Sequence, residues 1–428
     1  MAAEERMTLS DKWKVIRQVK PKYLKATRRE KGRWLDHLEE TLGMHRNSII
    51  RRIHSDLERK PRSRQRGRTY GAAVDDALRV ISEAFDHICA ERITPNLLWM
   101  AEHLAAHGEL RTTPDLLEKL ARISISTVKR TLTRIRQDEP SLRRRKAKPR
   151  SFTQGIPMKR IPWNEQEPGH FEVDLVHHCG TSASGEYVCT LQMIDVATGW
   201  SERFAVLGRS YRVMEDAFRC VLARLPFRVH EIHPDNGSEF FNRHLVTFWK
   251  EVAKGVQLTR SRPYHKNDNR IVEQKNATLV RQYIGYGRLD TVAHTNLLNE
   301  LYLKMGLYYN LFQPVSRLLE KTWVQDAEGR QTSVRRRHDT AQTPLDRLCA
   351  TDAIIDAHRQ ETLQIRKTVN PRELRRQIYN SIDKLLDLPL AQPGQKQSVF
   401  KTLGFPPIIR LGDGRPVTIS FDRTISLR

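Results

Sequence analysis

Three acidic residues occupy positions from which the carboxylates of distant chain segments can meet. Asp174 lies within the strand-like segment FEVDLVHH, Asp235 follows another such segment in HPDNGSEF, and Glu273 begins a helical pattern in NDNRIVEQKN. Sixty residues separate the first pair and thirty-seven separate the second. A strand centre, the end of a neighbouring strand and a helix packed across the sheet can bring three such side chains around one point. The pattern therefore predicts a cluster of carboxylates.

Clustered carboxylates repel one another, and without counter-ions at least one of them has a raised pKa. Divalent cations remove this conflict, because Mg²⁺ prefers oxygen ligands in octahedral geometry and keeps positions for water and phosphate oxygens. Two ions about 3.5–4 Å apart can activate an attacking oxygen and stabilise the leaving oxygen of a phosphodiester. The chemistry indicated is phosphoryl transfer with two Mg²⁺ ions, for which Mn²⁺ would substitute.

The segments around these residues resemble the catalytic core of DDE transposases and retroviral-type integrases. The resemblance covers about residues 165–310 and is carried by FEVDLV, IDVATGW, HPDNGSEF and RPYHKNDNRIVEQKN. It implies an RNase H-like fold in which Asp174, Asp235 and Glu273 are the metal-binding catalytic triad. The front end, with KGRWLDHLEETLGMHR, also resembles bacterial insertion-sequence transposases. The zinc-binding HHCC arm of retroviral integrases is missing, and the second interval is slightly longer than theirs.

Other acidic residues near the triad have simpler interpretations. Asp195 precedes a turn between two strands, where an aspartate commonly bonds the local backbone. Glu172 lies two residues before Asp174 on the same strand face, which makes it a neighbour of the site. Glu239 is expected to cap or orient the turn that follows Asp235.

Side chains that carry no negative charge surround the triad in the sequence. Near a metal-held phosphate, such groups can position a DNA strand or stabilise developing charge. For Asn269 a helix cap is an equal alternative, and Lys275 is expected to point away from Glu273. The DNA contacts predicted in the core are Asn236, His265, Lys266, Asn269 and Asn276.

The first 140 residues carry apolar residues at helical spacing. Within them, Trp34–Leu42 and Leu116–Leu120 each form an apolar helix face that a turn and a basic second helix follow. Both segments resemble helix-turn-helix units, whose second helix offers polar and basic side chains to the major groove of DNA. Ordinary helical hairpins with solvated charged faces are the alternative. The expected DNA contacts are Arg46, Asn47, Ser48, Arg51, Arg52, Ser126, Thr127, Lys129, Arg130 and Arg134.

The helical pattern gives way to strand-like alternation at about residue 165. Three strand-like segments come first, and strands that alternate with helices follow, an order typical of a mixed α/β sheet. The expected strands are 170–176, 187–196, 200–207, 227–233 and 256–261, and the expected helices are 213–225, 242–252 and a long one from about 268. After residue 310 we expect a hairpin around 326–329, helices near 344–366 and 371–387, and a β-like tail at 407–428.

The predicted chain is multidomain, with an all-α helix-turn-helix N-terminal region, an α/β RNase H-like core and a mixed α+β C-terminal region. Two basic clusters, Arg335–Arg337 and Arg372–Arg376, could bind DNA or mediate assembly, and the pattern leaves both open. The domains are expected at 1–60, 61–140 and 165–310, with a basic linker at 141–164 and a C-terminal domain at 311–428.

The composition of the chain favours a polyanionic partner. Lys and Arg number 74 and Asp and Glu number 50, which gives a formal net charge of +24. Two runs, 59–68 and 141–150, would track phosphates without reading sequence or would serve as solvated spacers.

No apolar segment approaches the roughly 20 residues of a membrane-spanning helix, and no signal peptide is expected. Five cysteines without a CxxC pair predict neither disulfides nor zinc. We expect a cytosolic, nucleoid-associated protein.

Together these observations predict an integrase-type DNA transposase. It would bind the terminal repeats of a mobile element, cut their 3′ ends and join them to target DNA. Its partners would be double-stranded DNA, at the element ends and the target, and further copies of the chain on DNA; an ATPase helper is left open. The alternatives are a structure-selective RNase H-like nuclease, which would not join DNA, and a non-catalytic repressor derived from a transposase.

Overall fold

The computed structural model of the chain divides into two compact units, Met1–Thr69 and Tyr70–Arg428. The residues that the structure describes are 7–55, 69–135, 161–162, 165–234, 240, 245, 247–249, 255–261, 268–325, 331–392, 394, 397–404, 408–410 and 416–418.

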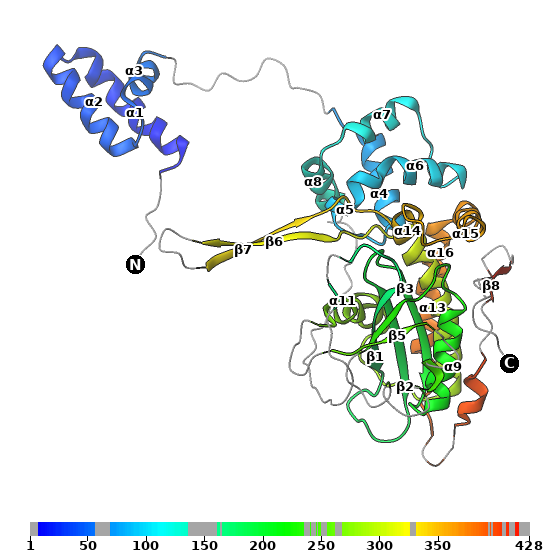
Figure 1. Cartoon of the computed structure of the whole chain (residues 1–428). Coiled ribbons are helices and arrows are strands. Elements are labelled where there is room, and N and C mark those ends of the chain that lie inside the picture. The colour runs from blue at the N-terminus through cyan, green and yellow to red at the C-terminus, as the bar shows by residue number, and fades with distance from the viewer. Residues whose placement is uncertain are drawn as a thin grey trace. The chain divides into compact units, whose positions relative to one another are not determined.

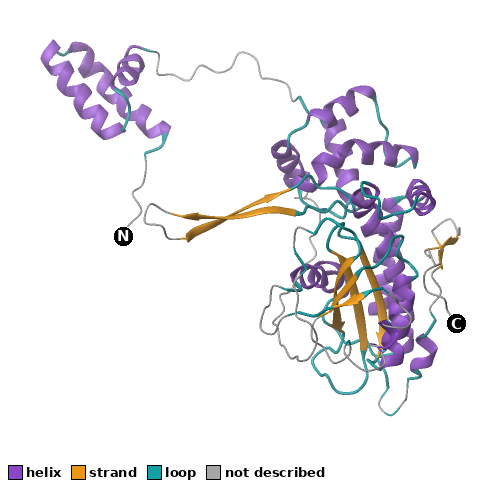
Figure 2. Ribbon diagram, in the orientation of Figure 1, coloured by secondary structure: helices purple, strands orange, loops and turns teal. Residues whose placement is uncertain are grey.

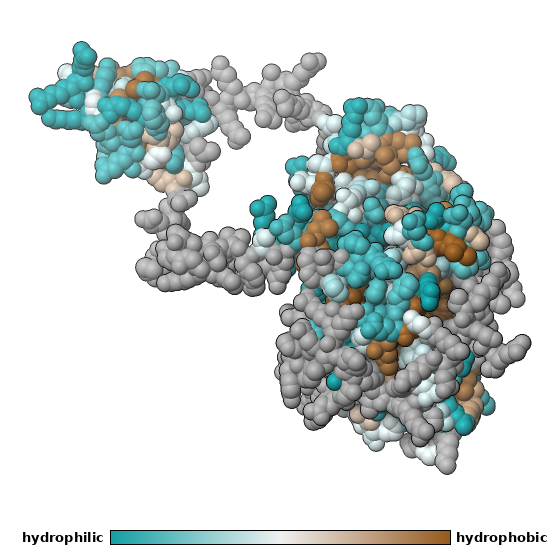
Figure 3. Space-filling view, in the orientation of Figure 1, coloured by the Kyte–Doolittle hydropathy of each residue, from teal (hydrophilic) through white to brown (hydrophobic). Residues whose placement is uncertain are grey.

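The first unit is built from three helices, which are α1 (Leu9–Lys25), α2 (Arg28–Leu42) and α3 (Arg46–His54). Thr8 begins α1 with a capping box, in which Thr8 and Asp11 each bond the backbone N–H of the other. Gly43 ends α2 with a φ of 56°, a left-handed conformation that glycine adopts without strain. The surface of the first unit is largely hydrophilic (Figure 3). Because α2 ends directly before Gly43 and α3 begins at Arg46, the helical hairpin predicted around Gly43 is confirmed.

Five helices open the second unit: α4 (Ala72–Ala84), α5 (Ala90–Ile93), α6 (Leu97–Ala106), α7 (Pro114–Arg122) and α8 (Ile125–Ile135). The Thr113 hydroxyl caps α7 by accepting a hydrogen bond from the Leu116 N–H. Buried apolar residues of α4 to α8 belong to the same hydrophobic cluster as those of the sheet that follows. The second predicted hairpin, α7–α8, is thus packed into the body of this unit.

A five-stranded sheet forms the centre of the second unit (Figure 1). Its strands are β1 (His170–His177), β2 (Val188–Asp195), β3 (Ser201–Leu207), β4 (Glu231–Pro234) and β5 (Gln257–Leu258). The order is β3-β2-β1-β4-β5, in which β1 to β3 are antiparallel and β4 and β5 run parallel to β1. The predicted mixed sheet is confirmed. The strand expected from Phe227 begins only at Glu231, because Phe227 instead forms an isolated β-bridge with Ile354.

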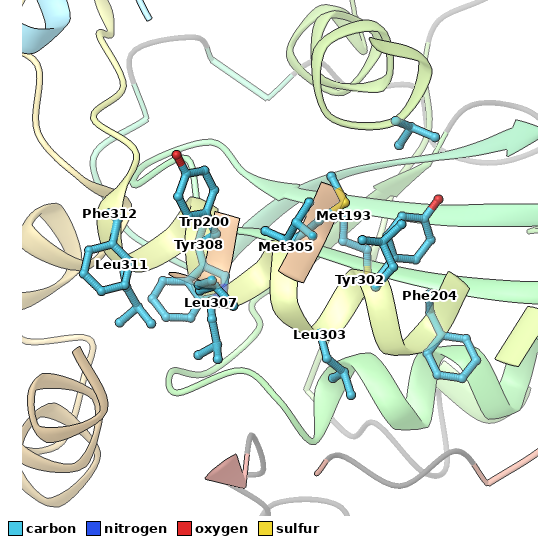
Figure 4. Packing of buried hydrophobic residues seen from close by; sticks show 14 of the residues in the cluster. Met193, Trp200, Phe204, Tyr302, Leu303, Met305, Leu307, Tyr308, Leu311 and Phe312 are labelled. Atoms are coloured by element: carbon cyan, nitrogen blue, oxygen red, sulfur yellow. The ribbon is translucent and has the colours of Figure 1, made fainter. Parts of the chain in front are cut away.

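Helices cover the sheet on both sides. These are α9 (Tyr211–Leu222), a helical run of α11 (Arg270–Lys275), η3 (Asn276–Arg281) and α12 (Gln282–Ile284), and α13 (Val292–Phe312). The sequence pattern predicted one long helix from about residue 268, but Gly285 has a φ of 78° and separates α12 from α13. Most residues of α13 are buried. Figure 4 shows Tyr302 and Met305 of this helix close to Met193 and Phe204 of the sheet.

The C-terminal part adds a two-stranded ribbon and more helices. Its elements are β6 (Leu318–Gln325), β7 (Gln331–His338), α14 (Pro344–Cys349), α15 (Asp356–Thr368), α16 (Pro371–Leu386), η4 (Val399–Thr402), β8 (Ile408–Arg410) and β9 (Pro416–Thr418). The predicted hairpin is the β6–β7 ribbon, which extends away from the sheet (Figure 2). Among the helices of the described residues, none combines the length and apolar character needed to cross a membrane.

Candidate active site

Asp174 lies on β1, the central strand of the sheet, and is half-buried. Its Oδ1 accepts a hydrogen bond from the backbone N–H of Leu175 at 2.8 Å. Its Oδ2 accepts one from the side-chain amide of Asn276 at 2.5 Å. Asn276 was predicted to contact DNA, and the structure shows that its amide orients Asp174. The carboxylate is thus held in position on both of its oxygens.

Glu273 lies on α11, three residues before Asn276, and its side chain is exposed. Residues three apart lie on the same face of a helix. Since Asn276 on that face reaches Asp174, the face that carries Glu273 is turned toward β1. The helical run passes from α-helical to π-helical geometry at Asn276, and such π segments are frequent at functional sites.

Glu172, which lies on the same strand as Asp174, fixes the beginning of α11. Its side chain is 2% exposed, and its Oε2 accepts hydrogen bonds from the backbone N–H groups of Ile271 at 2.8 Å and Val272 at 2.9 Å. Burial raises the pKa of Glu172 to about 7, although these two hydrogen bonds oppose the rise. Glu172 and Asp174 therefore anchor the helical run of α11 and η3 to β1 at two points, one on each side of Glu273.

Asn269 stands at the N-cap position of α11 without capping it through its side chain. The reason is that Glu172 already accepts from two of the N–H groups that a cap would serve. The Asn269 side chain is buried, and neither its amide nitrogen nor its amide oxygen has a hydrogen-bond partner among the described residues. Asn269 thus occupies the cap position that the sequence allowed for it, but its side chain does not supply the capping hydrogen bond.

The carboxyl end of β4 lies beside Asp174. In the parallel register of β1 and β4, Val173 pairs with Pro234. Val173 precedes Asp174 in the sequence, and Pro234 precedes Asp235. Five residues singled out in the sequence lie outside the described residues, and these are Asp235, Asn236, Glu239, His265 and Lys266.

A buried polar network joins β1, β4 and the chain after β5. His170 Nδ1 lies 2.9 Å from Glu231 Oε2, and this hydrogen bond raises the pKa of His170. The Thr259 hydroxyl donates to Glu231 Oε1 at 2.6 Å and lies 2.7 Å from His233 Nδ1. No motif in the sequence predicted this network, although the alternation of Glu231, Ile232 and His233 in a strand could have indicated a polar face. It holds in place the strand that leads to Asp235.

Two neighbouring charged residues have other partners. Asp195 is fully buried and accepts hydrogen bonds from the backbone N–H of Gly169 at 2.8 Å and of Thr198 at 2.7 Å. The bond from Thr198 is the local backbone bond that the turn interpretation predicted, whereas the bond from Gly169 spans 26 residues of the chain. The Lys275 ammonium lies 4.9 Å from the centre of the Tyr309 ring. The carboxylate of Asp195 is thus occupied by backbone N–H groups, and the Lys275 ammonium is directed to Tyr309.

The predicted contacts on α3 divide into two groups. Arg46 is bonded to Asp36, and the Arg52 guanidinium lies 4.6 Å from the centre of the Trp13 ring. These two side chains therefore stabilise the packing of the first unit. The other members are the exposed Asn47 and Arg51 and the half-buried Ser48.

On α8, the predicted contacts lie opposite a buried apolar face. Arg134 bonds Asp75 of α4 at 2.6 Å, yet it keeps 44% of its side chain exposed. The apolar face consists of Val128, Leu132 and Ile135. The other predicted contacts are Ser126, Lys129 and Arg130, which are exposed, and Thr127, which is half-buried. This helix presents more of its predicted contacts to solvent than α3 does.

The two basic clusters of the C-terminal part also differ. Arg335, Arg336 and Arg337 are exposed on β7. On α16, Arg372 bonds Glu83 at 2.6 Å and Glu109 at 2.5 Å. The Arg375 Nε bonds Asp86 at 2.8 Å, and Arg376 bonds Glu109 at 3.1 Å. The second cluster thus connects α16 to the helical segment that contains α4 to α7.

Comparisons with known proteins agree with this architecture. Residues 164–266 match the family model described as Integrase core domain. A protein of Sinorhizobium fredii (strain NBRC 101917 / NGR234), described as uncharacterized protein y4rM, is 35% identical over 319 residues. The alignment covers 74% of this chain and 91% of that protein.

The solved structures to which the chain is similar include three viral integrases. The HTLV-2 integrase catalytic core domain in complex with magnesium, in dimeric form, is 18% identical, with a TM-score of 0.26 over 35% of this chain and 90% of that one. The BIV integrase catalytic core is 17% identical, with a TM-score of 0.21 over 27% of this chain and 66% of that one. The simian T-cell lymphotropic virus intasome chain is 14% identical, with a TM-score of 0.26 over 43% of this chain and 59% of that one.

Proposed function

Because the chain belongs to the DDE transposase family with an integrase-type core, we propose that it moves a mobile DNA element. It binds the terminal repeats of the element, cuts their 3′ ends with water and then uses the 3′ hydroxyls to attack target DNA. Both steps are direct phosphoryl transfers without a covalent protein intermediate. Two element ends must be held together for joining, so the active form is an oligomer of the chain on DNA.

The attachment of α11 to β1 is the observation that carries this proposal. Glu172 and Asp174 each bond this helical run, at its start and at Asn276. Glu273 lies between these two anchors on the helix. Two members of the predicted triad therefore come from elements that are fixed to each other, which is what a preorganised catalytic site requires.

Asp174, Asp235 and Glu273 would hold two Mg²⁺ ions, or Mn²⁺ in their place. The donor set fits, because carboxylate oxygens are the ligands that Mg²⁺ prefers. Leu175 and Asn276 already orient the Asp174 carboxylate, and oriented ligands bind metals better. When bound, the ions would activate the attacking oxygen and stabilise the leaving 3′ oxygen.

Residues of the chain itself would then position the DNA strand. At the start of α11, Asn269 stays a predicted contact to the DNA backbone. The exposed polar side of α8, with Lys129 and Arg130, is the surface we assign to the element ends. In the first unit, Asn47 and Arg51 of α3 are the corresponding exposed contacts.

The test uses DNA that flanks the protein's own gene, incubated with Mg²⁺ or Mn²⁺ and with the parent protein or Glu273→Gln. A neutral amide of similar shape is a poorer metal ligand, so we expect cutting and joining to fall to the level without protein. End binding is expected to stay nearly intact. The matched control is Gln274→Ala, at an exposed position next to Glu273 on α11, and it is expected to cut and join like the parent.

The products distinguish the alternatives. Joined DNA at new sites that disappears in Glu273→Gln establishes transposition and reveals the ends. Metal-dependent cutting without joined products would instead favour the structure-selective nuclease. End binding without cutting, even with added cell extract that could supply a helper ATPase, would favour the repressor. Normal cutting by Glu273→Gln would overturn the metal assignment.

A further inference from the structure

The β6–β7 ribbon is a two-stranded sheet that pairs with no other described strand. Each strand has eight residues, which at about 3.3 Å per residue gives a ribbon of roughly 26 Å. Figures 1 and 2 show it extending from the body of the second unit. A two-stranded hairpin without a covering layer is only marginally stable in water. An arm of this kind is stabilised when it binds a partner.

The side chains of β7 indicate what that partner is. Arg335, Arg336 and Arg337 are consecutive and exposed, and successive residues of a strand point to opposite faces. Both faces of the ribbon therefore carry guanidinium groups. A partner that contacts both faces near these arginines is therefore expected to be anionic.

The facing strand compensates only one of these charges. Arg337 Nε lies 3.5 Å from Glu320 Oε2, but both side chains are more than half exposed, and such surface pairs contribute little. In the strand register, Arg336 pairs with Lys321 and Arg335 pairs with Thr322. Two of the three arginines therefore have no acidic residue at the paired position of β6.

We propose that the β6–β7 ribbon is an arm that binds the phosphate backbone of double-stranded DNA without reading its sequence. The major groove of B-DNA, about 12 Å wide, admits a two-stranded ribbon, and arginine pairs well with phosphate oxygens. This inference rests on the proposed function, since it assigns the arm to DNA that the transposase handles. It adds a contact surface separate from α3, α8 and the carboxylate site.

The test compares full-length parent protein with the triple variant Arg335→Gln, Arg336→Gln and Arg337→Gln. Binding to a duplex of random sequence is measured by fluorescence anisotropy over a series of salt concentrations. The logarithm of the binding constant falls with the logarithm of the salt concentration, and each lost phosphate contact makes this negative slope less steep by about 0.9. We expect the slope of the triple variant to be less steep by about 2 to 3, with weaker binding at low salt.

The control removes three positive charges elsewhere on the second unit. Lys367, Lys384 and Lys401 are exposed, and their replacement by Gln gives the same change in net charge. We expect this control to alter the slope much less than the ribbon variant does. Equal slopes for the two variants would overturn the proposal, because the effect would then be one of net charge alone.

Sedimentation of both proteins separates DNA binding from assembly. An unchanged salt slope together with an altered oligomeric state in the ribbon variant would show an arm that binds protein, which contradicts the proposal. The binding assay does not depend on catalysis. If parent and ribbon variant differ in slope as expected but the parent cuts no DNA, the proposal for the arm stands and the proposed function is contradicted. If the ribbon variant has the same slope as the parent and still joins DNA, the proposed function stands and the proposal for the arm is contradicted.

Discussion

The arginines of β7 and those of α16 are similarly dense in the sequence, but they meet different surroundings in the fold. Arg335–Arg337 extend into solvent, with one exposed acidic partner at Glu320. The α16 cluster bonds acidic residues that lie more than 250 positions earlier in the chain, among them Glu83 and Glu109. Charge density alone therefore does not identify a nucleic-acid surface. What matters is whether acidic residues of other elements already neutralise the charge.

Asp86 shows how closely the α16 cluster is integrated. Its carboxylate accepts hydrogen bonds from the Tyr283 hydroxyl at 2.6 Å, the Tyr379 hydroxyl at 2.9 Å and the Arg375 Nε at 2.8 Å. These donors come from α12 and α16, whereas Asp86 follows α4. The same carboxylate thus ties the helical segment to both the helical run that follows the sheet and the C-terminal part. We expect changes here to affect stability and changes on the ribbon to affect DNA binding.

The largest expected effect is that of Arg375→Ala. The substitution leaves Asp86 largely buried without its cation, and breaking a buried ion pair costs about 3 kcal/mol or more. Urea unfolding of the second unit is the measurement. Arg336→Ala on the ribbon is the control, and it is expected to change the free energy of unfolding by less than about 0.5 kcal/mol. Similar losses for both variants would remove the distinction between the clusters.

A second expected effect extends the comparison to acidic residues. Glu172 is buried and bonded to α11, whereas Glu273 on that helix is exposed. We expect Glu172→Leu to lower strand joining by about 10- to 100-fold, because the support of a metal ligand is lost. Glu172→Gln keeps an acceptor oxygen and should recover most of the activity. The apparent Mg²⁺ requirement should rise in Glu172→Leu, and an unchanged requirement would show a purely structural role.

The smallest expected effect is a dependence of stability on pH. Burial raises the pKa of Glu109, but hydrogen bonds and charges from Asn370, Arg372 and Arg376 outweigh it and leave the pKa below its usual value. A carboxyl with a lowered pKa stabilises the fold above its unfolded pKa, and the contribution disappears as the pH falls through the folded pKa. The parent should therefore lose stability below about pH 4.5 more steeply than Glu109→Gln does. Thermal unfolding from pH 6 to pH 3 measures the difference, and parallel curves would contradict it.

Local sequence patterns were sufficient for several of the strands and turns of the core. The alternation around Asp174, the turn at Thr198 and Gly199 and the helical spacing before and after Gly43 were visible within a few residues. Each is confirmed because hydrophobic period and turn chemistry act over such short distances. The order of the elements then predicted the mixed sheet. Phe227 was misassigned because its bridge partner, Ile354, lies far along the chain.

Only the tertiary structure decided how these elements are joined into a site. Nothing near Glu172 in the sequence shows that its carboxylate accepts N–H groups from Ile271 and Val272, about a hundred residues later. The same holds for the acidic residues that neutralise α16 and leave the ribbon arginines exposed. The sequence by itself determined which residue types the molecule has for the proposed phosphoryl transfer and DNA binding. Long-range packing decided which of those side chains are used inside the fold, because contacts between distant residues leave no periodic pattern in the sequence.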